Sequence, residues 1–283
     1  MPRKPPYALA GLATLLVLTG YVITLAPTVT FWDAGEFIAA AKTLGIPHPP
    51  GTPLFVMIAH VWAAILPFGE YAQRTNLLSA TLSALGSGCM FLVVHETLSR
   101  FTVGMEEMTG RATRAFGAFA AVLIAGFTFT TWQNSNETEV YAAACFTIAA
   151  IAWLSLRWRA YRGTARASHI LLLILYLGGI SIGNHLLALL AGPAVVAFMV
   201  MELWGNPANA PDERAMEWGQ AAVVAGTWAL LIGGGLGSTT LTVLGGLAFV
   251  GAALVAWRGK ALPFAVVALV IACVGVTSYL YLF

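Results

Sequence analysis

Long apolar runs separated by short polar segments dominate this chain. Most of the runs are close to the roughly 20 residues that a helix needs to cross a bilayer. A further apolar segment, Pro53–Pro67, is shorter and is bounded by prolines. The pattern predicts an all-α polytopic membrane protein with about nine crossing helices. The nine runs are Tyr7–Ala26, Leu77–Leu98, Ala115–Thr131, Tyr141–Leu156, Ile170–Ile182, Leu186–Trp204, Gln220–Leu236, Thr239–Trp257 and Leu262–Phe283.

The basic residues predict which side of the membrane each loop occupies. Short loops rich in Lys and Arg stay on the cytoplasmic side, and Arg3 and Lys4 place the N-terminus there. The Arg-rich loops near 100–114 and 157–166 join them only if Pro53–Pro67 does not cross. That segment is therefore predicted to be an interfacial or re-entrant helix on the outer side. Residues 27–76 then form a first outer loop, and residues 132–141 form a second.

Composition supports the membrane assignment and excludes several other classes. Hydrophobic residues make up 59% of the chain and charged residues 9%, whereas a soluble domain carries about 25% charged residues. The net charge of +2 is spread over short loops, which does not suggest nucleic-acid binding. We expect a single membrane domain over residues 1–283. The chain ends inside an apolar run, so we also expect that it is truncated at the C-terminus.

The first outer loop contains the densest group of ionisable residues. Asp33 and Glu36 lie three residues apart at the start of a predicted helix, Ala34–Leu44. This spacing is typical of a capping box, in which the two side chains bind main-chain N–H groups. Two carboxylates on one helical turn are equally suited to general-base chemistry above the bilayer. The sequence leaves both interpretations open.

Three further residues of this loop are candidates. His48 begins the turn His-Pro-Pro-Gly, which either only separates two helices or aims the imidazole toward Asp33. Arg74 and Asn76 follow Pro53–Pro67. Arg74 is basic on the side where basic residues are disfavoured, so it is either an interfacial anchor or a ligand for phosphate.

Glu139 and His185 are candidates elsewhere in the chain. Asn136 and Glu139 repeat the capping-box spacing, but Glu139 also places a second carboxylate on the outer side. His185 lies where one apolar run pauses, and it is either a helix–helix contact or part of a site. The three cysteines have no metal-ligand spacing, and no pair of histidines has it either. We therefore expect no metal and no cofactor.

Four stretches carry a resemblance to a known family. They are TFWDAGEFIAAAKTLGIPHPPGTPLF, ILPFGEYAQRTNLLSATLSAL, WQNSNETEVYAAACF and GISIGNHLLALLAGP. The chain resembles the domain-of-unknown-function 2723 membrane family, which is glycosyltransferase family 117 of the GT-C superfamily. The resemblance covers roughly Thr28 to Pro193. It implies a GT-C-type helical domain similar to the protein O-mannosyltransferases.

The resemblance also implies an activity. Such enzymes move a hexose, here expected to be mannose, from a polyprenyl-phosphate donor in the lipid bilayer to a hydroxyl of a protein or glycan on the outer or luminal side. It implies Asp33 as the general base and Glu36 as its support. Arg74 would bind the donor phosphate, with His48, Asn76, Glu139 and His185 as further substrate-binding residues. The enzyme would lie in the inner or plasma membrane of a bacterium, or in the endoplasmic reticulum. The alternative is a non-enzymatic membrane transporter, or a lipid-binding or assembly protein.

Overall fold

The computed structural model describes residues 4–282 as helices joined by short segments, and these residues include no strand. This confirms an all-α polytopic membrane protein. The helices form two compact units, which are described separately. The N-terminal unit extends to Trp153, and the C-terminal unit is Leu154–Tyr281. The prediction of a single domain is not tested by this division and stays a prediction.

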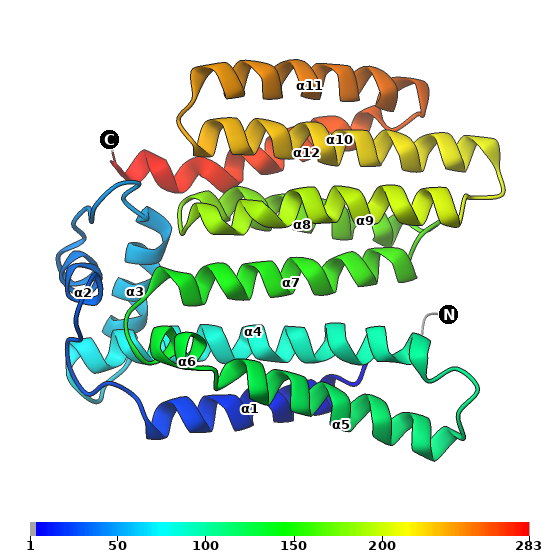
Figure 1. Cartoon of the computed structure of the whole chain (residues 1–283). Helices are drawn as coiled ribbons and strands as arrows, with labels where there is room; N and C mark the ends of the chain where they lie inside the picture. The colour runs from blue at the N-terminus through cyan, green and yellow to red at the C-terminus, as the bar shows by residue number, and fades with distance from the viewer. Residues whose placement is uncertain (1–3, 283) are drawn as a thin grey trace. The chain divides into compact units, whose positions relative to one another are not determined.

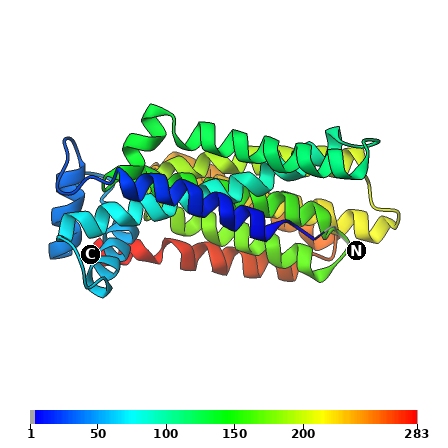
Figure 2. The same cartoon turned by 90° about the horizontal axis from the view of Figure 1, so that it is seen from below.

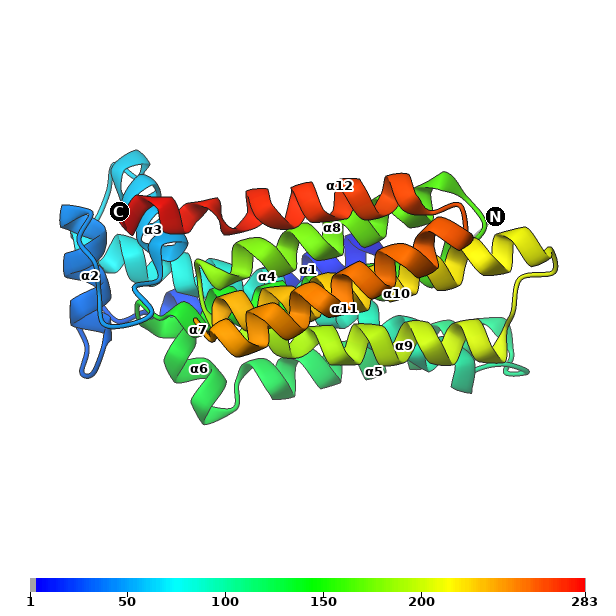
Figure 3. The same ribbon diagram turned by 90° about the horizontal axis from the view of Figure 1, so that it is seen from above.

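The N-terminal unit is arranged around one long helix. Its helices are α1 (Tyr7–Ile23), α2 (Ala34–Thr43), α3 (Pro53–Ile65), α4 (Tyr71–Phe101), α5 (Glu107–Gly126), α6 (Phe129–Asn136) and the first part of α7 (Val140–Ala160). α1 and α5 lie lengthwise beside α4 (Figure 1 and Figure 2). The short helices α2 and α3 lie together at one end of α4 (Figure 3).

Two apolar clusters hold this unit together. In the first, Phe37 of α2, Phe55 of α3 and Leu78 of α4 are almost completely buried against one another. In the second, Val17 and Tyr21 of α1 pack against alanines of α4. The Tyr21 hydroxyl also donates a hydrogen bond of 2.7 Å to the carbonyl of Gly126. The first cluster fixes the short helices to the long one, so it places the polar segment between them.

The C-terminal unit contains the end of α7 and seven further helical segments. These are α8 (Ala165–Ile182), η1 (Leu186–Leu190), α9 (Ala191–Gly205), α10 (Pro211–Gly235), α11 (Thr239–Arg258), α12 (Leu262–Gly275) and η2 (Val276–Leu282). α10 and α11 run side by side (Figure 1 and Figure 3).

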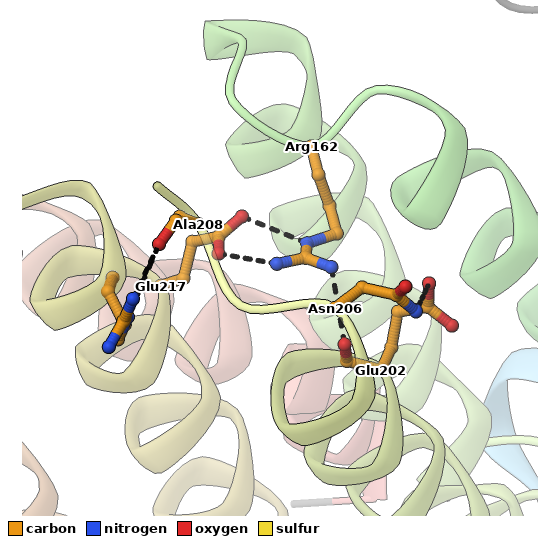
Figure 4. A network of polar contacts seen from close by, with 6 residues as sticks. Arg162, Glu202, Asn206, Ala208 and Glu217 are labelled. Atoms are coloured by element: carbon orange, nitrogen blue, oxygen red, sulfur yellow. Dashed lines mark hydrogen bonds and ion pairs between the residues drawn. The ribbon is translucent and has the colours of Figure 1, made fainter. Parts of the chain in front are cut away.

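Charged side chains also meet inside the C-terminal unit. Arg162 binds Glu217 through two hydrogen bonds, Nε to Oε1 at 3.0 Å and Nη2 to Oε2 at 2.7 Å. Its Nη1 donates to the main-chain carbonyl of Glu202 at 3.3 Å (Figure 4). Both partners of the ion pair are largely buried, with 14% and 7% of their side chains exposed.

Six described helical segments are long and apolar enough to cross a membrane, or seven if the bent pair α5–α6 is one span. That pair bends by 68° at Phe127 and Thr128. α1 and α3 are apolar but shorter. The multi-pass architecture is therefore confirmed, whereas the count of nine crossings stays a prediction.

Candidate functional site

Asp33 precedes α2 but does not cap it. Its backbone is right-handed helical (φ −73°, ψ −15°), and its side chain makes no capping hydrogen bond. The capping-box interpretation is therefore wrong here, because an N-cap residue normally has an extended backbone that turns its side chain toward the free N–H groups. Asp33 is exposed. Its carboxylate is thus not used to begin the helix.

Glu36 binds His48 instead of the helix start. One carboxylate oxygen accepts from the main-chain N–H of His48 at 2.6 Å, and the other lies 2.8 Å from Nδ1 of the imidazole. This hydrogen bond lowers the pKa of Glu36 and raises the pKa of His48, with the charges of Asp33 and Glu139 adding to the latter effect. A charged Glu36–His48 pair is thereby favoured.

The turn after α2 holds His48 in this position. Gly51 donates its N–H to the carbonyl of His48 at 2.9 Å, and its φ of 86° is one that glycine adopts without strain. The imidazole also lies against the buried ring of Phe37, with 5.6 Å between ring centroids. The turn therefore does more than separate two helices, since it directs His48 to the start of α2.

Asp33, Glu36 and His48 come together as one exposed cluster. Each offers one ligand atom, and these atoms all lie within 4.8 Å of one another. Two carboxylates and an imidazole are a donor set that Zn²⁺ or Mn²⁺ can use. The sequence analysis did not predict this set, because the histidine comes from a turn and not from a helical repeat. The Glu36–His48 hydrogen bond also accounts for the arrangement without a metal.

Glu139 lies in the short segment between α6 and α7. The predicted capping box is wrong here too, because Asn136 is the last residue of α6 and α7 begins at Val140. Most of the predicted outer loop 132–141 is thus helical. Glu139 is 6% exposed, and its Oε2 is buried without a hydrogen-bond partner. Burial, and then the charges of Glu137 and Asp33, raise the pKa of Glu139 to about 7.

Asn76 makes its hydrogen bonds entirely within the protein. The residue has 0% of its surface exposed. Its Nδ2 donates to the carbonyls of Ala26 and Thr28, and its Oδ1 accepts from the hydroxyl of Thr138. The predicted role in substrate binding does not fit this burial, because no substrate atom can reach the side chain in this structure.

Arg74 also forms hydrogen bonds within the protein. Its Nη1 donates to the carbonyls of Ala63 and Leu66 at 2.7 and 3.0 Å, where α3 ends. Its guanidinium carbon lies 5.8 Å from the ring centre of Tyr71, and Nζ of Lys42 lies 5.9 Å from that same centre. Two cations thus lie near the ring of Tyr71. Phosphate binding by Arg74 stays a prediction.

The sequence analysis gave no role to Lys42 or to two aromatic residues before Asp33. Phe31 and Trp32 have 87% and 88% of their surface exposed. Trp32 has a φ of 65°, an uncommon backbone angle for a bulky residue. Their position directly before Asp33 could have indicated a role, since exposed large apolar side chains next to a carboxylate are typical of an interface or a binding surface.

His185 belongs to the C-terminal unit. Its Nδ1 accepts from the N–H of Leu187 at 3.1 Å, which caps η1. The contact explains why a polar residue interrupts the apolar run. A role in substrate binding stays a prediction.

Comparisons with known proteins match the part of the chain that carries these residues. Residues 33–207, more than half of the chain, match the family model described as Protein O-mannosyl-transferase TMEM260 N-terminal domain. The match includes the cluster, Asn76 and Glu139. No solved structure matches the chain.

Two relatives carry the same description. The Protein O-mannosyl-transferase TMEM260 of Mus musculus is 28% identical over 165 residues, which is 58% of this chain and 22% of the relative. The Protein O-mannosyl-transferase tmem260 of Dictyostelium discoideum is 27% identical over 151 residues, 48% of this chain and 18% of the relative. The chain thus spans about a fifth of each relative's length. On the family match, this chain belongs to the family described as Protein O-mannosyl-transferase TMEM260 N-terminal domain.

Proposed function

We propose that this chain is a membrane glycosyltransferase that moves mannose from a polyprenyl-phosphate donor to a hydroxyl group of a protein. The distribution of Lys and Arg supports a site on the outer or luminal side. The relatives' description supports protein O-mannosylation. One structural observation supports the chemistry most directly: Asp33 presents an exposed carboxylate that caps no helix, beside an ordered Glu36–His48 pair.

In the proposed reaction Asp33 is the general base. The acceptor hydroxyl gives its proton to the Asp33 carboxylate, and its oxygen forms a new bond to the anomeric carbon of mannose. The bond from that carbon to the phosphate oxygen breaks from the opposite side, so the configuration inverts. The polyprenyl phosphate leaves with the bonding electrons. A positioned carboxylate in this role typically contributes a factor of about 10² to 10⁴ in rate.

The neighbouring groups support this role. The hydrogen bond to Glu36 holds the His48 imidazole in place, and the ligand atoms of both residues lie within 4.8 Å of that of Asp33. Lys42 and Arg74 supply the positive charge nearest to the cluster along the chain, and we assign them to the negative charge that develops on the leaving phosphate. The isoprenoid tail of the donor would lie in the bilayer.

The decisive experiment compares sugar transfer by the wild type and by Asp33→Asn. The purified chain is given polyprenyl-phosphate mannose and a peptide rich in Ser and Thr. Because Asp33 makes no capping bond, the substitution removes a charge without removing a helix contact. The matched control is Asp212→Asn, because Asp212 is also an exposed aspartate and its side chain binds only the exposed Lys260 in the C-terminal unit.

We expect Asp33→Asn to lose roughly 10²- to 10⁴-fold in kcat, with an unchanged unfolding temperature. Asp212→Asn should transfer at the wild-type rate, since exposed ion pairs contribute little. Equal transfer by Asp33→Asn and wild type would remove Asp33 from the mechanism. If the wild type binds the donor but transfers no mannose to any acceptor, the non-enzymatic alternative replaces this proposal.

A further inference from the structure

A buried polar network joins the two acidic segments through α4. Asn76 is its centre and is fully buried. Its Nδ2 lies 2.9 Å from the carbonyl oxygen of Ala26 and 3.1 Å from that of Thr28. Both carbonyls belong to the segment that leads from α1 to Asp33. The amide therefore holds the main chain of the first acidic segment at a fixed place on α4.

The other end of the same amide holds the second acidic segment. Oδ1 of Asn76 can only accept, so the hydroxyl of Thr138, 2.6 Å away, donates to it. That hydroxyl also lies 2.8 Å from Oγ1 of Thr75. One turn further along α4, Ser79 accepts the main-chain N–H of Glu139 at 3.0 Å. Thr75, Ser79 and Thr138 are as deeply buried as Asn76.

These contacts determine where the Glu139 carboxyl lies. Two successive residues are hydrogen-bonded to α4: Thr138 through its hydroxyl to Asn76, and Glu139 through its N–H to Ser79. The main chain at Glu139 is therefore held in place, which restricts where its side chain can lie. Its Oε2 is buried and has no partner. Its charge nevertheless interacts with those of Asp33 and His48 across the network, and with that of Glu137 beside it. A shift of this segment toward water would weaken all of these interactions.

We propose that Asn76 and Thr138 are positioning residues, which fix the Glu139 carboxyl relative to Asp33 by tying both acidic segments to α4. They act through the main chain and touch no substrate. The catalytic consequence rests on the proposed transferase function, whereas the placement of Glu139 can be tested without it.

The main variant is Thr138→Val, which keeps the shape of the side chain and removes only the hydroxyl. Thr138→Ser restores the hydroxyl. The matched control is Thr147→Val in α7. The Thr147 hydroxyl donates to the carbonyl of Ala143 one turn earlier in the same helix, so its loss affects no contact between segments. Ser79→Ala, which removes the acceptor for the Glu139 N–H, is the second variant if Thr138→Val does not fold.

The first measurement is the labelling of Glu139 by dicyclohexylcarbodiimide, followed by mass spectrometry of the peptide. This reagent adds to protonated carboxyl groups in apolar surroundings. In the wild type, burial raises the pKa of Glu139 to about 7, so labelling should be half-maximal near that pH. Thr138→Val should move the midpoint toward the ordinary carboxyl range, with severalfold less labelling at pH 7. Thr138→Ser and Thr147→Val should follow the wild type.

The second measurement separates kcat from KM for mannose transfer. We expect Thr138→Val to lower kcat by about fivefold, the equivalent of one hydrogen bond, with little change in KM. A purely structural role would lower the unfolding temperature while leaving the labelling midpoint and kcat unchanged, and that result would overturn the proposal. Altered labelling without any transfer by the wild type would support the positioning role and refute the transferase function. If the wild type transfers mannose, and Thr138→Val has the same labelling midpoint and kcat as Thr147→Val, the transferase function is supported and the positioning role is refuted.

Discussion

One region in each unit shows a different way of joining helices. In the N-terminal unit, buried side chains of α4 form hydrogen bonds with distant main-chain groups, as at Asn76 and Ser79. In the C-terminal unit, helices meet where glycines let the backbones approach closely. A methyl group on Gly275 would lie 2.8 Å from Cα of Gly179, and one on Gly245 would lie 2.7 Å from Cα of Leu230.

This contrast indicates which substitutions each unit tolerates. Glycine contacts depend on volume, so any added carbon disturbs them. Directional hydrogen bonds depend on chemistry, so an isosteric side chain without the polar atom disturbs them. Only the second kind fixes the orientation of a main-chain segment, which is what a site built on short connections needs.

The C-terminal unit also contains polar contacts between distant segments, such as the hydrogen bond from Trp228 to the carbonyl of Leu189. Among them, the buried Arg162–Glu217 ion pair offers the sharpest test of the comparison. Arg162→Met should lower the free energy of unfolding by about 3–5 kcal/mol, because it leaves the buried Glu217 carboxylate without its partner. The double variant Arg162→Met/Glu217→Met should recover most of that loss. Denaturation followed by circular dichroism measures both. A single variant as stable as the wild type would show that the pair is solvated.

Glu139 should make the N-terminal unit sensitive to pH in a particular direction. Its pKa rises from an ordinary 4.5 to about 7 in the folded protein. The folded state thus prefers the protonated form, so the contribution of Glu139 to stability is complete below pH 4.5 and is lost as the pH rises through 7. Glu139→Gln should stabilise the protein by up to about 3 kcal/mol at pH 8 and by almost nothing at pH 4.5. Thermal unfolding at the two pH values would show it, and equal effects at both would contradict the origin assigned to the shift.

Two neighbouring glycines test whether the C-terminal unit depends on volume. Gly245→Ala should destabilise by about 1–3 kcal/mol, since the new methyl group meets the backbone of α10. Gly246→Ala has nothing within 4 Å and should stabilise by up to about 1 kcal/mol through helix propensity. Unfolding temperatures of the two variants give the comparison directly. If both move in the same direction, close backbone approach is not what limits this interface.

The smallest effect is expected at the exposed Glu36–His48 pair. The lowered pKa of Glu36 and the raised pKa of His48 mean that the pair is fully charged between their ordinary values of 4.5 and 6.5. Its stabilisation should fall below this window as Glu36 takes up a proton, and above it as His48 loses one. Glu36→Gln should lower the pKa of His48, measured from its imidazole NMR signals, and change stability by less than about 1 kcal/mol. If the pKa of His48 is the same in the wild type and in Glu36→Gln, the Glu36 carboxylate and the His48 imidazole are not in contact in solution.

The sequence identified Asp33, Glu36 and His48 as candidates and left open whether His48 points toward Asp33; it did not predict that the three form one cluster. The three residues are joined by one helix and one proline turn, so local rules suffice to identify them as neighbours in the chain. The same rules failed for helix starts. Asp33 and Asn136 both have the spacing of a cap, but Glu36 finds a better partner in His48, and α6 continues through Asn136.

Contacts between distant segments could not be predicted in this way. Nothing near Asn76 in the sequence indicates that its partners are Ala26, Thr28 and Thr138, so the sequence alone suggests a substrate ligand where the structure has a buried amide. Similarly, the interpretation of Arg74 rests on its position on the outer side, whereas its bonds to the end of α3 depend on how α3 folds back on α4. Burial and partner identity come from packing, which the pattern of apolar residues does not specify.

The position of Asn76 in the chain has a consequence for biosynthesis. A ribosome makes Ala26 and Thr28 first, then Asn76, and Thr138 only 62 residues later. When α4 enters the membrane, the amide can already bind the first segment, while its oxygen has no partner until α6 has been made. We therefore expect the N-terminal unit to assemble in two stages. A nascent chain that stops before Thr138 should hold the Asp33 segment on α4 without the Glu139 segment.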